Sequence, residues 1–95
     1  MNHNKQLEKV ISGKFITSIS TSSIGIVVML DDGTRMTVQA ENIDLPKGPK
    51  FTTTFQSGAT LRFNFDDTST HDILLLKEGS SIFVRDGNGH FAYSN

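Results

Sequence analysis

The chain has 95 residues, of which 36% are hydrophobic and 20% are charged, so it has room for one hydrophobic core and not for a second domain. Nine Lys and Arg against ten Asp and Glu give a formal net charge of -1, which argues against a protein dedicated to binding duplex nucleic acid. The absence of cysteine excludes a disulfide, a thiolate zinc site and a cysteine nucleophile. The polar N-terminus and the short apolar runs predict no signal peptide and no membrane segment, and therefore a cytoplasmic protein.

Residues 4–12 are predicted to form a short helix at the N-terminus. Leu7, Val10 and Ile11 follow the i, i+3, i+4 spacing of one helix face, and Gly13 suits the position just beyond a helix end. Three apolar residues make a narrow face, so this helix is expected to persist only where it packs against the rest of the chain.

From residue 14 onward, short runs rich in Thr, Ile, Val and Phe are separated by Gly, Asp and Asn, which is typical of β-strands and turns. Residues 41–49 contain two prolines and are expected to cross between two sheets. The chain is therefore predicted to be a single all-β domain, with a helix in residues 1–13 and a β body in residues 14–95. We expect a small antiparallel sandwich or partly open barrel of seven or eight strands. The sequence shows no internal repeat at a fixed period. The predicted strands are residues 14–20, 24–30, 34–40, 50–56, 60–66, 72–77, 81–85 and 90–94.

The pair Asp32-Gly33 signals a tight turn between the second and third predicted strands. A two-residue turn places apolar residues opposite one another, whereas a three-residue loop shifts the register by one and separates them. The register preferred on this basis sets Met29 opposite Met36 and Val27 opposite Val38, with all four side chains in the core.

The same register predicts a second apolar surface on the other side of this hairpin. Ile26, Val28 and Leu30 lie there, because successive side chains of a strand point to opposite faces. Either the helix or the apolar run 73–76 covers these residues within the monomer, or they form a self-association face. We expect the second arrangement, a homodimer.

Two later hairpins are predicted in the same way, with a three-residue loop at 57–59 and a two-residue turn at 87–88. The loop at 57–59 places Thr52, Thr54, Arg62 and Asn64 together on the reverse of the sheet, as a candidate polar binding face. The predicted pairs are Phe55 with Leu61, Thr53 with Phe63 and Phe51 with Phe65, then Val84 with Phe91 and Ile82 with Tyr93.

No motif indicates a catalytic or metal site. Asp66, Asp67, His71 and Asp72 form the densest cluster of potential metal ligands, but their neighbours are typical of an exposed turn, and His71 and Asp72 would point to opposite faces of a strand. Residues 86–89 resemble the start of a calcium-binding loop but lack its later acidic ligand. We therefore expect no metal, no cofactor and no enzyme activity.

These observations predict a non-enzymatic protein-interaction module, of the kind found among inhibitors, immunity proteins and structural subunits of phage-like assemblies. The expected partner is another protein, a second copy of the chain, or both. The alternative is a small β-barrel that binds single-stranded nucleic acid, because residues 62–65 and 90–93 alternate aromatic side chains with basic or polar ones. This alternative is disfavoured because the predicted register buries Phe63 and Phe65, and because acidic residues balance the basic ones.

Overall fold

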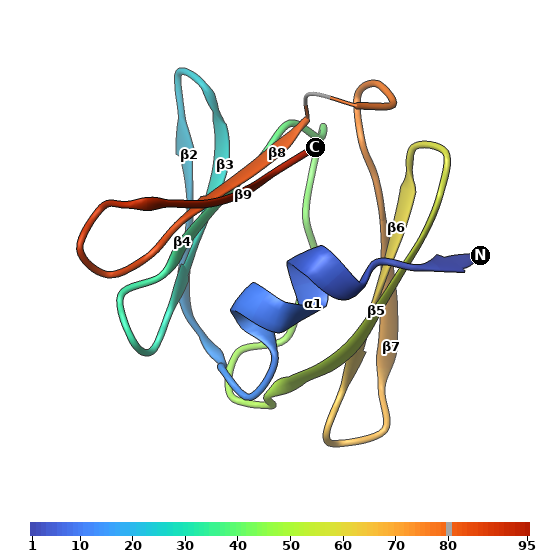
Figure 1. The fold of residues 1–95 in the computed structure, drawn as a ribbon, viewed down its shortest axis with the longest axis horizontal. Coiled ribbons are helices and arrows are strands. Elements are labelled where there is room, and N and C mark those ends of the chain that lie inside the picture. The colour runs from blue at the N-terminus through green and yellow to red at the C-terminus, as the bar shows by residue number, and fades with distance from the viewer. Residues whose placement is uncertain (80) are drawn as a thin grey trace.

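The computed structural model describes residues 1–79 and 81–95 and is mostly β, with two antiparallel sheets and one short helix (Figure 1). The all-β prediction is confirmed, and the described residues form nine strands in place of the seven or eight predicted. The elements are β1 (Asn2–His3), α1 (Lys5–Ile11), β2 (Ile16–Ser22), β3 (Gly25–Leu30), β4 (Arg35–Val38), β5 (Phe51–Ser57), β6 (Thr60–Phe65), β7 (Thr70–Leu74), β8 (Ile82–Arg85) and β9 (Phe91–Ser94).

The two sheets face one another across the core. One has the strand order β1-β5-β6-β7 and the other the order β2-β3-β4-β8-β9. Isolated bridges from Phe15 to Lys50 and from Ala40 to Leu75 join the sheets at two corners. Figure 1 shows the sheets on opposite sides of the molecule with α1 between them. The arrangement is a small sandwich with linked corners, within the range of architectures predicted from the sequence.

Helix α1 begins and ends within one residue of the predicted bounds, 4 and 12, which are its two cap residues. The side chain of Asn4 accepts a hydrogen bond of 3.1 Å from the backbone N–H of Leu7, which satisfies one of the free donors of the first turn. Gly13 lies beyond the helix with a φ of +79°. Leu7 and Ile11 are fully buried, and the helix packs against β5 and β9. This packing supplies the tertiary support that a helix of two turns needs.

The core lies between the sheets and under the helix. It contains apolar residues from α1 and from strands of both sheets. Separately, no helix among the described residues is long and apolar enough to span a membrane. The side chains with the deepest burial include Leu7, Ile11, Ile16, Val28, Met36, Val38, Phe51, Leu61, Phe63, Ile82 and Val84.

The chain contains a structural repeat with an offset of 35 residues, although no internal repeat at a fixed period is evident in its sequence. Adding 35 to the bounds of β2 and β3 gives the bounds of β5 and β6, and β4 and β7 begin at equivalent residues. Both three-stranded units carry a bulge at the same place, after Ile16 in one and after Phe51 in the other. The two bridges that join the sheets link equivalent residues of the two units. An approximate twofold relation therefore connects the sheets.

Equivalent aspartates make the same hydrogen bonds in the two units. The Asp31 carboxylate accepts from the backbone N–H of Phe15 at 3.0 Å, and the Asp66 carboxylate accepts from that of Lys50 at 2.9 Å. The next residue in each unit, Asp32 or Asp67, accepts from the backbone N–H two positions further on. The repeat is not evident in the sequence, because few residues other than these aspartates are identical to the residue 35 positions away.

The predicted register of the β3–β4 hairpin is wrong by one residue. The connection is a three-residue loop, in which Gly33 donates to the Leu30 carbonyl at 3.0 Å and takes a φ of +89°. This loop type requires a left-handed residue at its third position, and glycine supplies one without strain. The strand pairs are consequently Ile26 with Val38, Val27 with Thr37, Val28 with Met36 and Met29 with Arg35.

The predicted register of the β5–β6 hairpin is also wrong near its turn. The connection is a two-residue turn at residues 58–59, so Thr54 pairs with Phe63 and Phe55 pairs with Arg62. The bulge in β5 then shifts the register again, and only the predicted pairing of Phe51 with Phe65 is confirmed.

The β8–β9 hairpin has a three-residue loop at residues 87–89, in place of the predicted two-residue turn. The N–H of Asp86 donates to the carbonyl of His90 at 2.8 Å, and Gly89 takes a φ of +83°. Val84 pairs with Tyr93, and a bulge next to this pair brings Arg85 opposite Phe91. The predicted pairings of Val84 with Phe91 and of Ile82 with Tyr93 are therefore wrong.

Candidate functional site

The predicted self-association face lies in the core. Ile26, Val28 and Leu30 are 8%, 0% and 2% exposed and point toward the opposite sheet. The cause is the one-residue difference in register, since such a shift moves every side chain of a strand to the other face. These residues cannot reach another molecule while the sandwich is closed.

The residues of the predicted polar binding face do not share one face. Thr54 is buried at 1% exposure, whereas Thr52 is exposed beside the bulge of β5. Arg62 and Asn64 do lie on the outer side of β6, where both make internal contacts. The Arg62 guanidinium donates two hydrogen bonds to the Asp72 carboxylate, at 2.8 and 3.0 Å.

Asn64 is held by its neighbours on the outer side of the same sheet. Its side-chain nitrogen donates to the Thr53 hydroxyl at 2.8 Å, and its oxygen accepts from the Thr70 hydroxyl at 2.6 Å. These contacts, with the ion pair on the same strand, satisfy most of the polar groups on the outer side of the four-stranded sheet. That surface therefore offers few free groups to a ligand.

The potential metal ligands that cluster in the sequence, Asp66, Asp67, His71 and Asp72, do not form a metal site in the structure. The carboxylate of Asp67 accepts from Ser69, and this contact lowers the pKa of that carboxyl. The ion pair with Arg62 lowers the pKa of Asp72 in the same way. His71 packs edge-on against the ring of Phe65, so it points away from Asp72, as predicted. The described residues contain no group of three potential metal ligands.

The outer side of the five-stranded sheet is different, and we call it the arginine face. Its residues lie in two rows that cross the sheet, each made of directly paired neighbours. None of them is acidic. One row is Ser18, Met29, Arg35, Arg85 and Phe91, and the other is Ser20, Val27, Thr37, Phe83 and Ser94, of which Thr37 is covered by its neighbours and 2% exposed.

Two arginines lie directly opposite each other at the centre of this face. Arg35 of β4 pairs with Arg85 of β8, and both side chains are exposed. Like charges in this arrangement destabilise a sheet. Among residues 1–79 and 81–95, neither arginine forms an ion pair, and the only hydrogen bond that either side chain makes runs from Arg85 to the Gly89 carbonyl at 3.0 Å. Both guanidinium groups therefore retain donors for an external acceptor.

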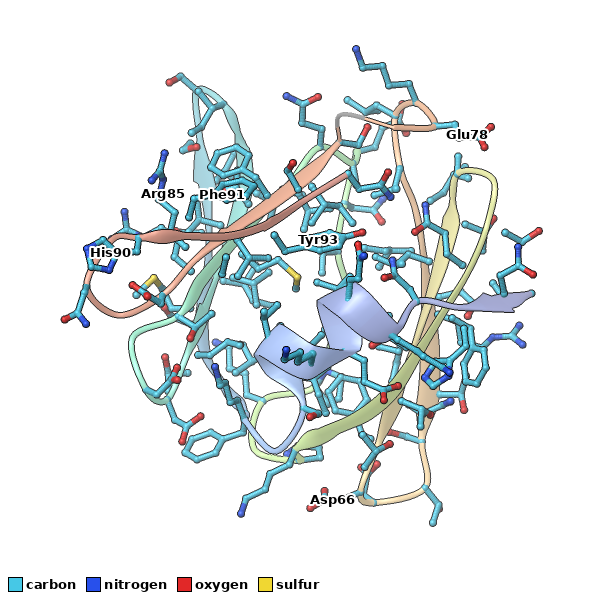
Figure 2. The ribbon with its side chains drawn as sticks, viewed as in Figure 1. Asp66, Glu78, Arg85, His90, Phe91 and Tyr93 are labelled. Carbon is cyan, nitrogen blue, oxygen red and sulfur yellow. The ribbon has the colours of Figure 1, made fainter. Side chains whose placement is uncertain are left out.

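Apolar side chains lie next to the arginines in the same row. Met29 pairs with Arg35, and Phe91 pairs with Arg85 and is 61% exposed. Figure 2 shows Phe91 and Tyr93 on opposite sides of β9, with Tyr93 toward the helix and Phe91 on the side of Arg85. The bulge in the β8–β9 ladder produces this difference, because without it residues two apart in a strand point to the same side.

Another groove lies between the N-terminus, the β5–β6 turn and the C-terminus. It has a volume of about 660 Å³, and five of its ten lining residues carry side-chain amides. Two of these, Asn4 and Asn95, donate to the Gln56 side-chain oxygen at 3.0 and 3.1 Å. The amides thus hold the two chain ends against β5, which is a structural role.

Sequence reasoning missed the arginine face for two reasons. The wrong register of β3 placed Met29 in the core, and the pairing of Arg35 with Arg85 joins strands that are far apart in the sequence. A usable signal was present in the hairpin loop, because Gly33 suits the third position of a three-residue loop as well as the second position of a tight turn.

Comparisons of this chain with protein-family models, with curated proteins and with solved structures found no match. The functional argument therefore rests on the geometry described above.

Proposed function

We propose that this protein is a non-enzymatic protein-interaction module, whose arginine face binds an acidic and partly apolar surface of another protein chain. The observation that carries the proposal is the pair of opposed arginines, Arg35 and Arg85, between the exposed or half-buried side chains of Met29 and Phe91. A carboxylate placed between the guanidinium groups would relieve their repulsion and form charge-assisted hydrogen bonds. Arginine and aromatic residues are also the types that contribute most to protein interfaces.

A second candidate function is the binding of single-stranded nucleic acid. It is favoured by one observation, the exposed ring of Phe91 beside two arginines, because such proteins stack bases on aromatic rings and bind phosphates with basic residues. The electrostatic contribution is small. Two phosphate contacts correspond to a salt slope of about -1.4, so a fourfold rise in salt lowers the affinity only about sevenfold. The net charge of -1 adds no attraction, and we therefore place a protein partner first.

The test compares capture by the wild-type chain with capture by the variant Arg35→Glu/Arg85→Glu, both immobilised and exposed to a lysate of the native host. The proposal predicts a protein that the wild-type chain retains and the variant loses. The matched control is Lys5→Glu/Lys47→Glu, which changes the charge by the same amount at two exposed positions outside the arginine face.

Capture that is the same for the wild type and the arginine variant would contradict the proposal. Nucleic acid is tested separately with labelled single strands at low salt. Binding that the arginine variant loses, and that weakens with added salt, would favour the second candidate over the first.

A further inference from the structure

We propose that the protein partner is a second copy of this chain, bound head-to-tail, with the arginine face of one copy on a different surface of the next. This inference rests on the proposed function and adds the identity of the partner. The second surface, which we call the leucine edge, consists of Leu74 and Leu76, the adjacent carboxylates Glu41 and Asp44, and Asp72.

The leucine edge carries the two most exposed of the large apolar side chains in the described part of the chain. Leu74 is 69% exposed and Leu76 is 62% exposed, followed by Phe91 of the arginine face at 61%. Side chains of β7 and the residues after it alternate, so Ile73 and Leu75 enter the core while the two exposed leucines point outward. Apolar side chains grouped and exposed in this way are typical of interaction surfaces.

The leucine edge is hollowed and acidic. A cavity with a volume of about 490 Å³ lies between the end of β7 and the segment after β4, and its lining includes Glu41, Asp44 and Asp72. Asp72 is already paired with Arg62, whereas neither Glu41 nor Asp44 forms an ion pair within residues 1–79 and 81–95. The cavity can receive an apolar side chain from a partner, and two carboxylates remain to bind positive charge.

The two surfaces complement each other in charge. Within residues 1–79 and 81–95, the two arginines of the arginine face form no ion pairs, and neither do two carboxylates of the leucine edge, Glu41 and Asp44. Each surface carries apolar side chains next to its charges, with Phe91 and Met29 on one and Leu74 and Leu76 on the other. Contact between them pairs opposite charges and buries both apolar groups.

Charge also disfavours the symmetric arrangements. An isologous dimer through the arginine face would bring two copies of Arg35 and Arg85 together, and one through the leucine edge would bring together two copies of Glu41 and Asp44. Like charges across an interface cost free energy and suppress that pairing. The head-to-tail contact has no such penalty.

The two surfaces lie on different parts of the molecule, which determines the kind of assembly. The arginine face is the outer side of the five-stranded sheet, whereas the leucine edge lies where the end of β7, in the four-stranded sheet, meets the segment after β4. A standard interface buries about 800 Å² per partner, which is about 15% of the total surface of 5226 Å². Both surfaces can therefore be occupied at once. Because a heterologous contact leaves one free surface at each end, it produces a ring or an open chain and not a closed dimer.

The experiment uses sedimentation velocity on the full chain at concentrations from micromolar to near millimolar. One variant, Arg35→Glu/Arg85→Glu, removes the arginine face, and another, Leu74→Ser/Leu76→Ser, removes the leucine edge. All four residues are exposed, so both variants are expected to fold, which circular dichroism checks. The wild type should form species larger than two chains as its concentration rises, and added salt should reduce them.

Mixing the variants separates a head-to-tail contact from every symmetric one. Each variant alone should remain monomeric, whereas an equal mixture should form two-chain species and nothing larger, because only one intact surface of each kind remains. The control Lys5→Glu/Lys47→Glu should assemble like the wild type. If the arginine substitutions disturb folding, Phe91→Ser tests the same face with a single exposed residue.

Four results would overturn the inference: a wild type that stays monomeric throughout, a closed dimer, association that either variant alone retains, or a mixture of variants that stays monomeric. A monomeric wild type that still captures a different protein through Arg35 and Arg85 would reject self-association and leave the proposed function standing. Self-association that the arginine variant retains would, in contrast, reject the arginine face as the interface.

Discussion

The substitution Thr54→Val is expected to stabilise the protein. The Thr54 hydroxyl is buried and has no hydrogen-bond partner among the described residues, although the backbone N–H of the same residue donates to Glu8 at 2.9 Å. A buried hydroxyl without a partner costs about 1–3 kcal/mol, and valine replaces it with a methyl group in nearly the same space. We expect the free energy of unfolding to rise by about 1–2 kcal/mol, since the site already accepts a β-branched side chain. The equivalent residue of the other structural unit is Ile19, which packs against the core.

The assay is urea unfolding followed by circular dichroism, with Thr34→Val as the matched control. Thr34 is also 1% exposed, but its hydroxyl accepts a hydrogen bond from the Lys14 ammonium at 3.1 Å. Losing that bond should lower the free energy of unfolding by about 1 kcal/mol, so the two variants should shift in opposite directions with unchanged m-values. For a domain of this size, each kcal/mol corresponds to about 4–8 °C in Tm. A decrease of 1 kcal/mol or more for Thr54→Val would show that its hydroxyl is hydrogen-bonded in the folded protein, and would refute the reasoning.

Four further substitutions test the loops and the core. Thr68 has a φ of +70°, which strains a β-branched residue, so Thr68→Gly should stabilise the protein by about 0.5–1 kcal/mol. Gly33 occupies the equivalent position of the other unit, and Gly33→Ala should destabilise the protein by about 1 kcal/mol or more. Thermal unfolding measures both changes. Hydrogen bonds from Thr34 lower the pKa of Asp32 from 3.8 to about 2. Because the pKa of Asp32 is lower in the folded state than in the unfolded state, the ionised carboxylate contributes to the free energy of unfolding above pH 4. This contribution is lost as the pH falls toward 2. Asp32→Asn should therefore reduce stability at pH 6 by less than about 1 kcal/mol, given the 45% exposed side chain, and the difference from wild type should vanish near pH 2 in urea unfolding. Val28→Lys should abolish cooperative unfolding, because Val28 is 0% exposed, and a folded variant would contradict the observed register of β3.

The helix and the eight longer strands could be predicted because their signals are local. The apolar spacing of Leu7, Val10 and Ile11 and the run lengths between turn residues specify these elements without reference to the rest of the chain. The short first strand, β1, was not predicted. It consists of Asn2 and His3, which have no apolar pattern, and it exists because β5 offers a free edge beside the start of the helix.

The registers could not be predicted because apolar matching does not identify a loop type. The tight turn predicted at Gly33 pairs Met29 with Met36, which matches two large apolar residues, and yet the chain adopts the other register. The reason lies in the loop, where the Asp32 carboxylate accepts from the backbone N–H of Thr34 at 2.9 Å and Gly33 supplies the left-handed residue. The bulges add a second difficulty, since each shifts the register within a strand and leaves no clear mark in the sequence.

Comparing the two repeated units gives a way to infer the register of the β3–β4 hairpin, which arguments from that hairpin alone could not establish. Asp66 and Asp67 stand at the same place in their hairpin as Asp31 and Asp32, and the loop after each pair has the same hydrogen bonds. In the second loop the left-handed position holds Thr68, so glycine is not the only residue that this loop accepts. The paired aspartates, which bind both the loop and the strand beside it, are therefore a better signal of the register than the Asp-Gly turn.

The same register decides which side chains of β3 lie on the outer side of the five-stranded sheet. A one-residue shift in β3 would bury Met29 and expose Val28, so the row that joins Met29 to Arg35 exists only with the observed loop. Arg35 and Arg85 are both exposed, so the packing of the core does not require a charged residue at either position. An uncharged polar residue at one of these positions would avoid the repulsion between the two arginines. The fold therefore does not account for the opposed arginines. The acidic partner surface that we propose would account for them, because it would convert the repulsion of the free protein into part of the free energy of binding, and local conflicts of this kind are expected at functional sites.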